Sequence, residues 1–156
     1  MHAAILGTRT LHWLDEAACA VWASSLARKP ELTDAFIALH GPLGAGKTTC
    51  VRHLLRALGV TGRIKSPTFA VLEPYALPGL LISHFDLYRF EDPQEWLDAG
   101  FREQFEVPGL KLVEWPEKAA GVLPLADVDV FIDARAGDTR RVTLQAHTAR
   151  GLALLA

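Results

Sequence analysis

Apolar and polar residues follow two different periods along the first third of the chain. Residues 8–14 are typical of a strand, and Asp15 suits the N-cap of a helix from residue 16 to about residue 28. The apolar run 36–39 is long enough for a buried strand. A second helix is expected behind it, ending at Gly59, because apolar residues recur there at helical spacing: Val51, Leu54, Leu55 and Leu58.

The middle of the chain predicts turns, one strand and a polar segment after it. Pro74 and the pair 78–79 mark turns after a short apolar stretch. The run 80–85 reads as a strand that ends at Asp86. Aromatic and apolar residues at helical spacings favour one or two short helices within residues 91–106.

The last part of the chain favours strands again. The apolar run 110–113 predicts a strand that ends at Glu114. Residues 128–133 and 141–146 alternate or nearly alternate between apolar and polar, and the segment 136–139 between them is rich in turn residues. This pattern predicts an antiparallel hairpin, and therefore a mixed sheet if the strands before it are parallel.

A phosphate-binding motif lies between the first buried strand and the helix behind it. Residues 41–48 match G-x-x-x-x-G-K-[ST], the P-loop, in the strand-to-helix context that the motif requires. The motif predicts a nucleoside-triphosphate binder with an α/β fold, a P-loop NTPase-type three-layer sandwich whose mixed sheet ends in the hairpin. At this length and composition we expect residues 1–156 to form a single P-loop domain.

Each residue type of the motif has a physical reason. Gly41, Gly44 and Gly46 can take positive φ angles, so that successive amide groups turn inward around phosphate oxygens. The helix that begins near Lys47 adds the positive end of its dipole. Lys47 brings a cation to the outer phosphates, and the Thr48 hydroxyl can ligate Mg²⁺. A glycine-rich turn with a solvated lysine is the structural alternative.

Two acids end predicted strands, at the edge where ligands of α/β sheets collect. Asp86 and Glu114 each follow an apolar run, as the magnesium-binding acid of P-loop proteins does. Such a site needs one carboxylate for Mg²⁺, directly or through water, and often a second to orient the attacking water. The alternative for each is a surface carboxylate at a strand end, and the sequence does not decide which acid meets the metal.

Three other residues are candidates with ordinary structural alternatives. Thr68, on a loop stiffened by Pro67, can carry a hydroxyl toward Mg²⁺ and the γ-phosphate as a switch. The alternative, a proline turn that packs Phe69 into the core, is slightly favoured by the loop residues alone. Trp115 is either a core aromatic or a site residue. Among the arginines near the hairpin, which are solvated charges by default, Arg140 is the one we expect at the nucleotide.

Composition limits the partners and the surroundings of the protein. The formal net charge is −2 at pH 7, so no global basic field holds nucleic acid, and any RNA role is expected to pass through a partner. The N-terminal residues lack a basic start, and no apolar run approaches membrane-spanning length. These features predict a cytoplasmic protein that does not bind a membrane. Cys19 and Cys50 lack metal-ligand spacing, which favours buried free thiols.

The nucleotide and the reaction follow from what the chain lacks. Guanine recognition in GTPases uses N-K-x-D, and this sequence contains no asparagine, so ATP is expected rather than GTP. A small-metabolite kinase shares the length and the motif and is one alternative, although only Arg63, Arg89 and Arg102 lie between residues 61 and 124 for an arginine-bearing lid. A docking module that binds nucleotide without hydrolysing it is another.

Five short blocks of the sequence resemble the TsaE family. They occur in the order and approximate spacing seen in that family: residues 41–49, 65–69, 73–75, 84–89 and 113–117. TsaE proteins are bacterial ATPases of tRNA threonylcarbamoyladenosine biosynthesis. The resemblance implies a single-domain ATPase that binds ATP or ADP with Mg²⁺ and hydrolyses ATP slowly on its own. It further implies work with TsaB and TsaD, which attach threonylcarbamoyl to adenosine 37 of ANN-decoding tRNAs, so that tRNA is met only through the complex.

The resemblance also implies roles for individual residues. Those that would contact the phosphates are Gly44, Ala45, Gly46, Lys47, Thr48 and Thr49. Thr48 would ligate Mg²⁺ and the loop 66–68 would act as a switch. Asp86 would be the metal-binding acid, Glu114 would serve Mg²⁺ or water activation, and Trp115 would lie beside the nucleotide.

Overall fold

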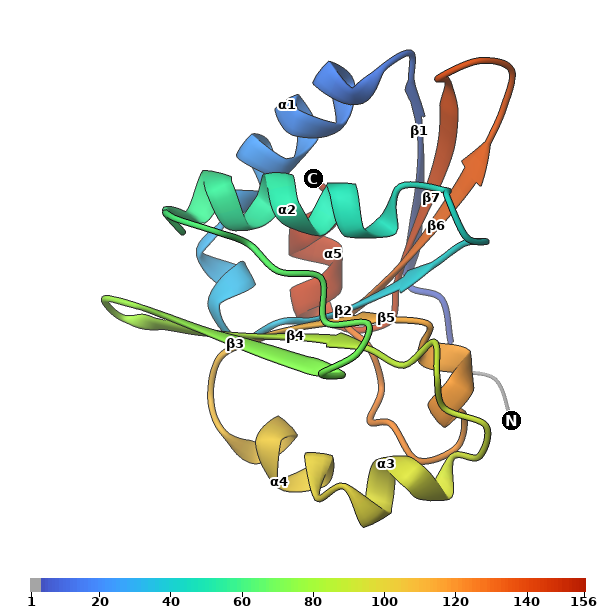
Figure 1. Cartoon of the computed structure of the whole chain (residues 1–156). Coiled ribbons are helices and arrows are strands. Elements are labelled where there is room, and N and C mark those ends of the chain that lie inside the picture. The colour runs from blue at the N-terminus through green and yellow to red at the C-terminus, as the bar shows by residue number, and fades with distance from the viewer. Residues whose placement is uncertain (1–3) are drawn as a thin grey trace.

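Seven strands form a single mixed sheet with the order β1-β7-β6-β2-β5-β4-β3 (Figure 1). The computed structural model describes residues 4–156; residues 1–3, part of the N-terminal stretch discussed above, lie outside the described residues. The strands are β1 (Gly7–Trp13), β2 (Phe36–His40), β3 (Leu72–Leu77), β4 (Leu80–Asp86), β5 (Leu110–Glu114), β6 (Val128–Ala134) and β7 (Arg140–Ala146).

Helices cover both faces of this sheet. They are α1 (Glu16–Ala27), α2 (Lys47–Leu58), α3 (Gln94–Asp98), α4 (Phe101–Glu106) and α5 (Ala149–Leu155), with the 3₁₀ turns η1 (Pro30–Asp34) and η2 (Pro116–Ala119). Helices α1, α2 and α5 pack on one apolar core, and α3, α4 and η2 pack on a second core across the sheet (Figure 1). The expected three layers and the antiparallel hairpin of β6 and β7 are therefore confirmed.

The main helices begin and end where the sequence predicts. The Asp15 carboxylate accepts a hydrogen bond of 3.0 Å from the amide of Ala18 and so caps α1. Helix α2 starts directly after Gly46 and stops at Gly59, and both glycines have left-handed backbone angles. A residue with a Cβ would be strained there, which explains why glycine bounds this helix at both ends.

The prediction of a turn at Pro74 is wrong. Pro74 lies inside β3, opposite Ser83 of β4, and the strand begins only at Leu72. Strand β3 is the edge of the sheet, where a residue without an N–H group can face outward without breaking a ladder. Residues 78–79 do form the turn between β3 and β4, with Gly79 at φ 75°.

The sequence patterns do not predict helix α5, which is fixed by one buried acid. Asp127 accepts hydrogen bonds from the Phe36 amide at 2.8 Å and from the Thr148 hydroxyl at 2.6 Å. The Thr148 hydroxyl in turn accepts from the Gly151 amide at 2.9 Å and caps α5. One carboxylate thus ties the start of β2 to the last helix.

Within residues 4–156, the structure contains no helix that is long and apolar enough to cross a membrane.

Gly151 is expected to be irreplaceable in α5. A Cβ atom added to Gly151 would lie 2.0 Å from the Asp127 carbonyl oxygen, so Gly151→Ala must displace the helix. We expect the free energy of unfolding to fall by about 2 kcal/mol or more, measured by urea denaturation. Ala149→Gly on the same helix is the control and should cost about 1 kcal/mol or less. Gain of stability in Gly151→Ala would contradict this packing.

Candidate nucleotide site

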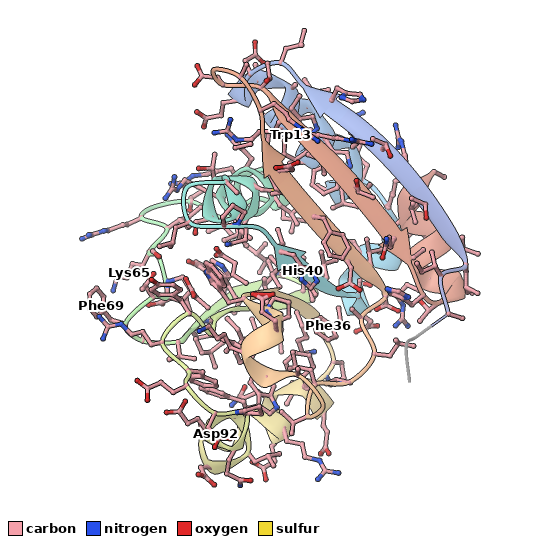
Figure 2. The ribbon with its side chains drawn as sticks, turned by 90° about the vertical axis from the view of Figure 1, so that its right-hand side faces the viewer. Trp13, Phe36, His40, Lys65, Phe69 and Asp92 are labelled. Carbon is pink, nitrogen blue, oxygen red and sulfur yellow. The ribbon has the colours of Figure 1, made fainter. Side chains whose placement is uncertain are left out.

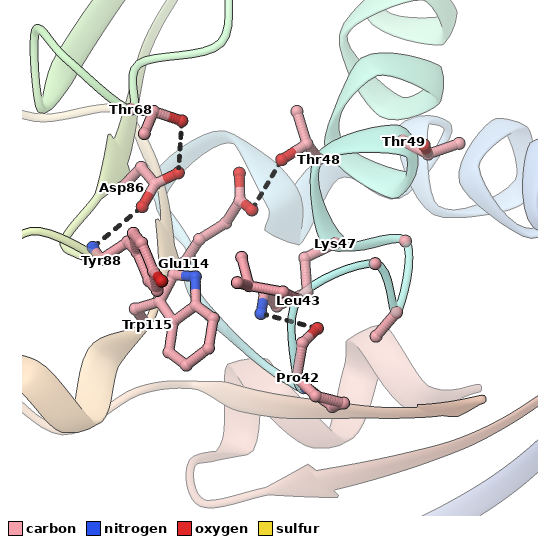
Figure 3. Close-up of a pocket in the computed structure, with 13 residues that line it drawn as sticks. Pro42, Leu43, Lys47, Thr48, Thr49, Thr68, Asp86, Tyr88, Glu114 and Trp115 are labelled. Atoms are coloured by element: carbon pink, nitrogen blue, oxygen red, sulfur yellow. Dashed lines mark hydrogen bonds between the residues drawn. The ribbon is translucent and has the colours of Figure 1, made fainter.

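Parallel strand pairing gathers the candidate residues at one edge of the sheet. Strands β4, β5 and β2 are parallel neighbours, and Asp86 pairs in register with Glu114, which pairs with Leu39. The residues after β2 are the P-loop, so the loop and both acids meet. They line a pocket of about 300 Å³ (Figure 3), whose walls are Pro42, Leu43, Gly44, Ala45, Gly46, Lys47, Thr48, Thr49, Thr68, Asp86, Tyr88, Glu114 and Trp115.

The loop backbone has the conformation that the motif predicts. Gly41, Gly44 and Gly46 have φ angles of 152°, 79° and 106°. A Cβ on Gly41 would lie 2.7 Å from the Ile132 carbonyl oxygen, whereas Gly44 and Gly46 have open space around that position. The first helical bond of α2 runs from the Cys50 amide to the Gly46 carbonyl at 2.9 Å. The amides before Cys50 in this turn therefore lack helical partners, as an anion site requires.

Lys47 is folded back against its own loop. Its ammonium group donates to the carbonyl oxygens of Gly41 and, at 3.4 Å, of Pro42. The same group lies 3.7 Å from the centroid of the Trp115 ring, a cation–π contact. Burial lowers the pKa of Lys47, and the charges of the nearby acids oppose that change. Lys47 is thus a pre-positioned cation with no carboxylate bound directly to it among the described residues.

Glu114 connects the sheet to the P-loop helix. Its side chain is buried, with one oxygen accepting from the Thr48 hydroxyl at 2.8 Å (Figure 3). The other oxygen lies 2.6 Å from His84 Nε2, which donates to it. Both oxygens of this buried carboxylate therefore have a hydrogen-bond partner.

His84 is a site residue that the sequence analysis did not single out. It is fully buried, and its Nδ1 atom has no hydrogen-bond partner among the described residues. The available signal was the period of a strand, because residues 84 and 86 point to the same face of β4. His84 therefore stands behind Glu114 on the face that carries Asp86.

Asp86 is held on the opposite wall of the pocket by its neighbours. Its oxygens accept from the Tyr88 amide at 2.9 Å and from the Thr68 hydroxyl at 3.2 Å. Burial raises the pKa of Asp86, the Glu114 charge adds to the rise, and the two hydrogen bonds oppose it. Unlike Glu114, this acid makes no contact with Thr48 among the described hydrogen bonds.

The loop of Thr68 reaches the site as expected, but the alternative with Phe69 in the core is wrong. The Thr68 hydroxyl also lies 2.9 Å from that of Ser66, and the Asp86 amide donates to the Val71 carbonyl at 2.9 Å. Val71 has a left-handed backbone with a φ of 69°, and the Phe69 side chain before it is 79% exposed. The backbone of this loop is therefore tied to the acid rather than packed by its aromatic ring.

Trp115 lines the pocket and also packs, half-buried, against the second core. Its backbone is left-handed, with φ 59°, a conformation that non-glycine residues adopt rarely and that is common at functional sites. The ring is 5.1 Å from that of Tyr88 on one side and is covered by Lys47 on another. This turn carries the chain from Glu114 into η2.

Arg140 supports the P-loop from behind and does not line the main pocket. Its Nε donates to the Ala45 carbonyl at 2.9 Å. It lines a second pocket of about 260 Å³, which shares Gly44, Ala45, Gly46 and Thr49 with the first. Cys19 and Cys50 are both buried free thiols, as predicted, and Cys19 also lines this second pocket. Arg135 and Arg150 instead pair with Asp133 and Asp127.

A charged cluster lies under the P-loop, next to Gly41. His40 contacts the Asp129 carboxylate at 2.7 Å and the Glu117 carboxylate at 3.3 Å, and it stacks on Phe131. Asp129 also contacts His147 at 2.7 Å. Burial alone would lower the pKa of His40, but the hydrogen bonds and charges of Asp129 and Glu117 outweigh it and raise the pKa to about 9. The imidazolium thus links β2 to η2.

The donor set fits a magnesium–nucleotide complex. The amides of the glycine-rich loop and Lys47 present positive charge for phosphates. The hydroxyl oxygen of Thr48 and the carboxylate oxygens of Glu114 and Asp86 are the hard ligands that Mg²⁺ prefers. Together, the mixed sheet and this loop geometry define a P-loop NTPase-type protein.

Comparisons with known proteins agree with this class. A family model described as "Threonylcarbamoyl adenosine biosynthesis protein TsaE" matches residues 14–142. The chain belongs to the TsaE family of tRNA threonylcarbamoyladenosine biosynthesis. A relative from Haemophilus influenzae with the name "tRNA threonylcarbamoyladenosine biosynthesis protein TsaE" is 46% identical over 113 residues, 72% of this chain and 71% of its own.

A Bacillus subtilis relative with the same name is 37% identical over 110 residues, 70% of this chain and 68% of its own. Among solved structures, the crystal structure of Bacillus subtilis YdiB has a TM-score of 0.79 and 27% identity, and the match covers 97% of this chain and 94% of YdiB. The P-loop NTPase-type fold predicted from the motif is thereby supported over nearly the whole chain.

The His40 cluster predicts a pH dependence of stability. Because the folded-state pKa of His40 is raised, its contribution is complete below the unfolded pKa of about 6.5 and is lost as pH rises through about 9. The difference in free energy of unfolding between wild type and His40→Gln should therefore be larger at about pH 6 than at about pH 10. Exposed His12→Gln controls for loss of an imidazole. A His40 NMR titration midpoint near 6.5 would contradict the cluster.

Proposed function

We propose that the protein binds and hydrolyses ATP in the formation of threonylcarbamoyladenosine on tRNA. The observation that carries the proposal is the hydrogen bond between Thr48 of the P-loop and Glu114 at the end of the adjacent parallel strand. A hydroxyl and a carboxylate brought together at the helix N-terminus are the protein ligands that a phosphate-bound Mg²⁺ needs.

Thr48 and Glu114 are the residues that would hold Mg²⁺, because they contact each other, whereas Asp86 contacts Thr68 and is the second acid. This assignment differs from the one that the resemblance implies, in which Asp86 binds the metal. When bound, the metal would neutralise charge that develops on the phosphate oxygens. Lys47 leaves Gly41 and Pro42 to meet the outer phosphates, and the amides between Gly44 and Thr49 hold the inner ones. Asp86, held by Thr68, orients the water that attacks the terminal phosphorus, and the bond to the leaving ADP oxygen breaks.

The partners and the place of this activity follow the family. The protein works with TsaB and TsaD in the cytoplasm and meets tRNA within that assembly, while the transfer of threonylcarbamoyl belongs to the partners. Reconstitution tests this role: purified chain with TsaB and TsaD should form the modified adenosine over many turnovers only with ATP. If Lys47→Ala supported equal yields over many turnovers, the proposed role would fail.

Removal of the P-loop cation should weaken nucleotide binding. Lys47→Ala loses a charge-assisted contact to phosphate, so we expect ATP affinity to fall by about ten-fold or more in isothermal calorimetry. Arg135→Ala, an exposed cation on the β6–β7 turn, is the charge-matched control. Equal affinities of the two variants would show that nucleotide does not bind at this loop.

The two acids should fail in different ways. Glu114→Gln weakens the metal ligand, so the Mg²⁺ concentration for half-maximal phosphate release should rise, whereas Asp86→Asn should lower the maximal rate by about 100-fold without that shift. Both variants should still bind ATP, because the amides and Lys47 remain. Exposed Glu106→Gln is the control.

The same assays separate the proposal from its alternatives. Exchange of the two phenotypes between Asp86 and Glu114 would reverse the assignment of the acids. Phosphate delivered to a metabolite without partners would indicate a kinase. Binding of ATP with no phosphate release in the presence of TsaB and TsaD would indicate a docking module.

A further inference from the structure

Charge is strongly segregated along the chain, although the net charge is small. Residues 35–72 contain no acidic residue, and their basic ones are Lys47, Arg52, Arg56, Arg63 and Lys65. Residues 91–106 are the reverse, with Arg102 as the basic residue and with Glu91, Asp92, Glu95, Asp98, Glu103 and Glu106 as the acids. A net charge of −2 therefore conceals a basic segment and an acidic one.

The fold brings the basic residues together at the β3 side of the molecule. Arg52 and Arg56 lie one turn apart on α2, and the charges of both act on the hydroxyl of Tyr75 on β3. Burial raises the pKa of Tyr75 and the charge of Glu73 adds to the rise, whereas the Lys65 backbone and the charges of Arg56 and Arg52 oppose it. Lys65 and Phe69 project from the loop that follows α2 (Figure 2).

An aromatic ring extends this basic surface toward the candidate site. The Arg89 guanidinium lies 4.1 Å from the centroid of the Phe69 ring, which is otherwise open to solvent. We call Arg52, Arg56, Arg63, Lys65, Phe69 and Arg89 the basic edge. All six side chains are exposed, and none of the cations takes part in an ion pair with the described residues.

The basic edge has the chemistry of an RNA-binding surface. Exposed cations of one sign repel each other and gain most from an extended polyanion, since a phosphate backbone releases counterions on binding. An exposed aromatic ring beside arginines suits an unpaired base, which stacks on such a platform, whereas an acidic protein surface offers nothing for it. Because the family acts in tRNA modification, RNA is the polyanion that we expect this surface to meet.

We propose that the basic edge binds RNA directly, with cations on the phosphate backbone and Phe69 stacked on an unpaired base. The expectation from net charge, that RNA is met only through partners, overlooks this local concentration. The basic edge continues into the loop 66–68, and Thr68 of that loop touches Asp86. RNA bound here would therefore lie next to the switch loop of the candidate site.

Fluorescence anisotropy with a labelled RNA stem–loop, without nucleotide, tests the proposal. If about five cations meet phosphates, log affinity should fall with log salt with a slope of about −4, so binding weakens about 200-fold between about 50 and 200 mM salt. In Arg52→Gln/Arg56→Gln the slope should be smaller by about 2 and the low-salt affinity at least about ten-fold lower. Arg135→Gln/Arg141→Gln is the control with the same net charge.

Phe69→Ala tests the stacking contact separately. Affinity for the stem–loop should fall by about five-fold or more with an unchanged salt slope, and affinity for a fully paired RNA should stay the same. Unchanged thermal unfolding of the variants excludes misfolding. Equal losses in the control pair, no RNA binding at about 50 mM salt, or loss of TsaB or TsaD binding with RNA binding intact would each overturn the proposal.

This inference and the proposed function fail separately. The basic-edge residues do not line the pocket, so their variants should bind ATP as wild type does. RNA binding by a chain that binds no ATP would refute the proposed ATPase and leave the basic edge standing. ATP hydrolysis by a chain that binds no RNA would do the reverse.

Discussion

The parallel alignment of β4, β5 and β2 is the constraint on which the site depends. Parallel strands direct their carboxyl ends to the same edge of the sheet. Residues far apart in sequence are therefore brought together by the strand pairing, and their side chains need not contact each other to be placed there. Asp86, Glu114 and the P-loop are the three strand continuations at that edge. A register shift of one residue in β5 would turn the Glu114 side chain to the other face of the sheet.

Glu114 and Lys47 are the buried charges at this edge of the sheet, and each is compensated by its neighbours. A buried carboxylate is costly unless it is bonded, and Thr48 and His84 supply the bonds. A buried ammonium is costly for the same reason, and two loop carbonyls and the Trp115 face receive it. The left-handed turn at Trp115 is held through Glu117 by His40, the residue next to Gly41. The loop and the acid are therefore positioned before any ligand arrives.

Local patterns predicted the parts of this site that need no tertiary information. The P-loop glycines, the acids at strand ends and the glycine stop of α2 each follow from one residue type in one local context. The prediction of a turn at Pro74 was wrong because proline is tolerated in an edge strand, and the local sequence does not reveal that β3 is an edge strand. The prediction of a buried Phe69 was wrong because the loop is held by the backbone of Val71, whose carbonyl accepts from the Asp86 amide, and not by a buried aromatic ring. The roles of His84, Asp127 and the His40 cluster could not be predicted from local patterns, because their partners lie far away in sequence.

A crystal structure of the chain with Mg²⁺ and a non-hydrolysable ATP analogue measures the account most directly. We expect the β-phosphate inside the ring of amides from Gly44 to Thr48, the metal against Thr48 and Glu114, and the Lys47 ammonium moved from Gly41 to a phosphate oxygen. Triphosphate density outside this loop, or Lys47 still bonded to Gly41 beside a bound nucleotide, would contradict it.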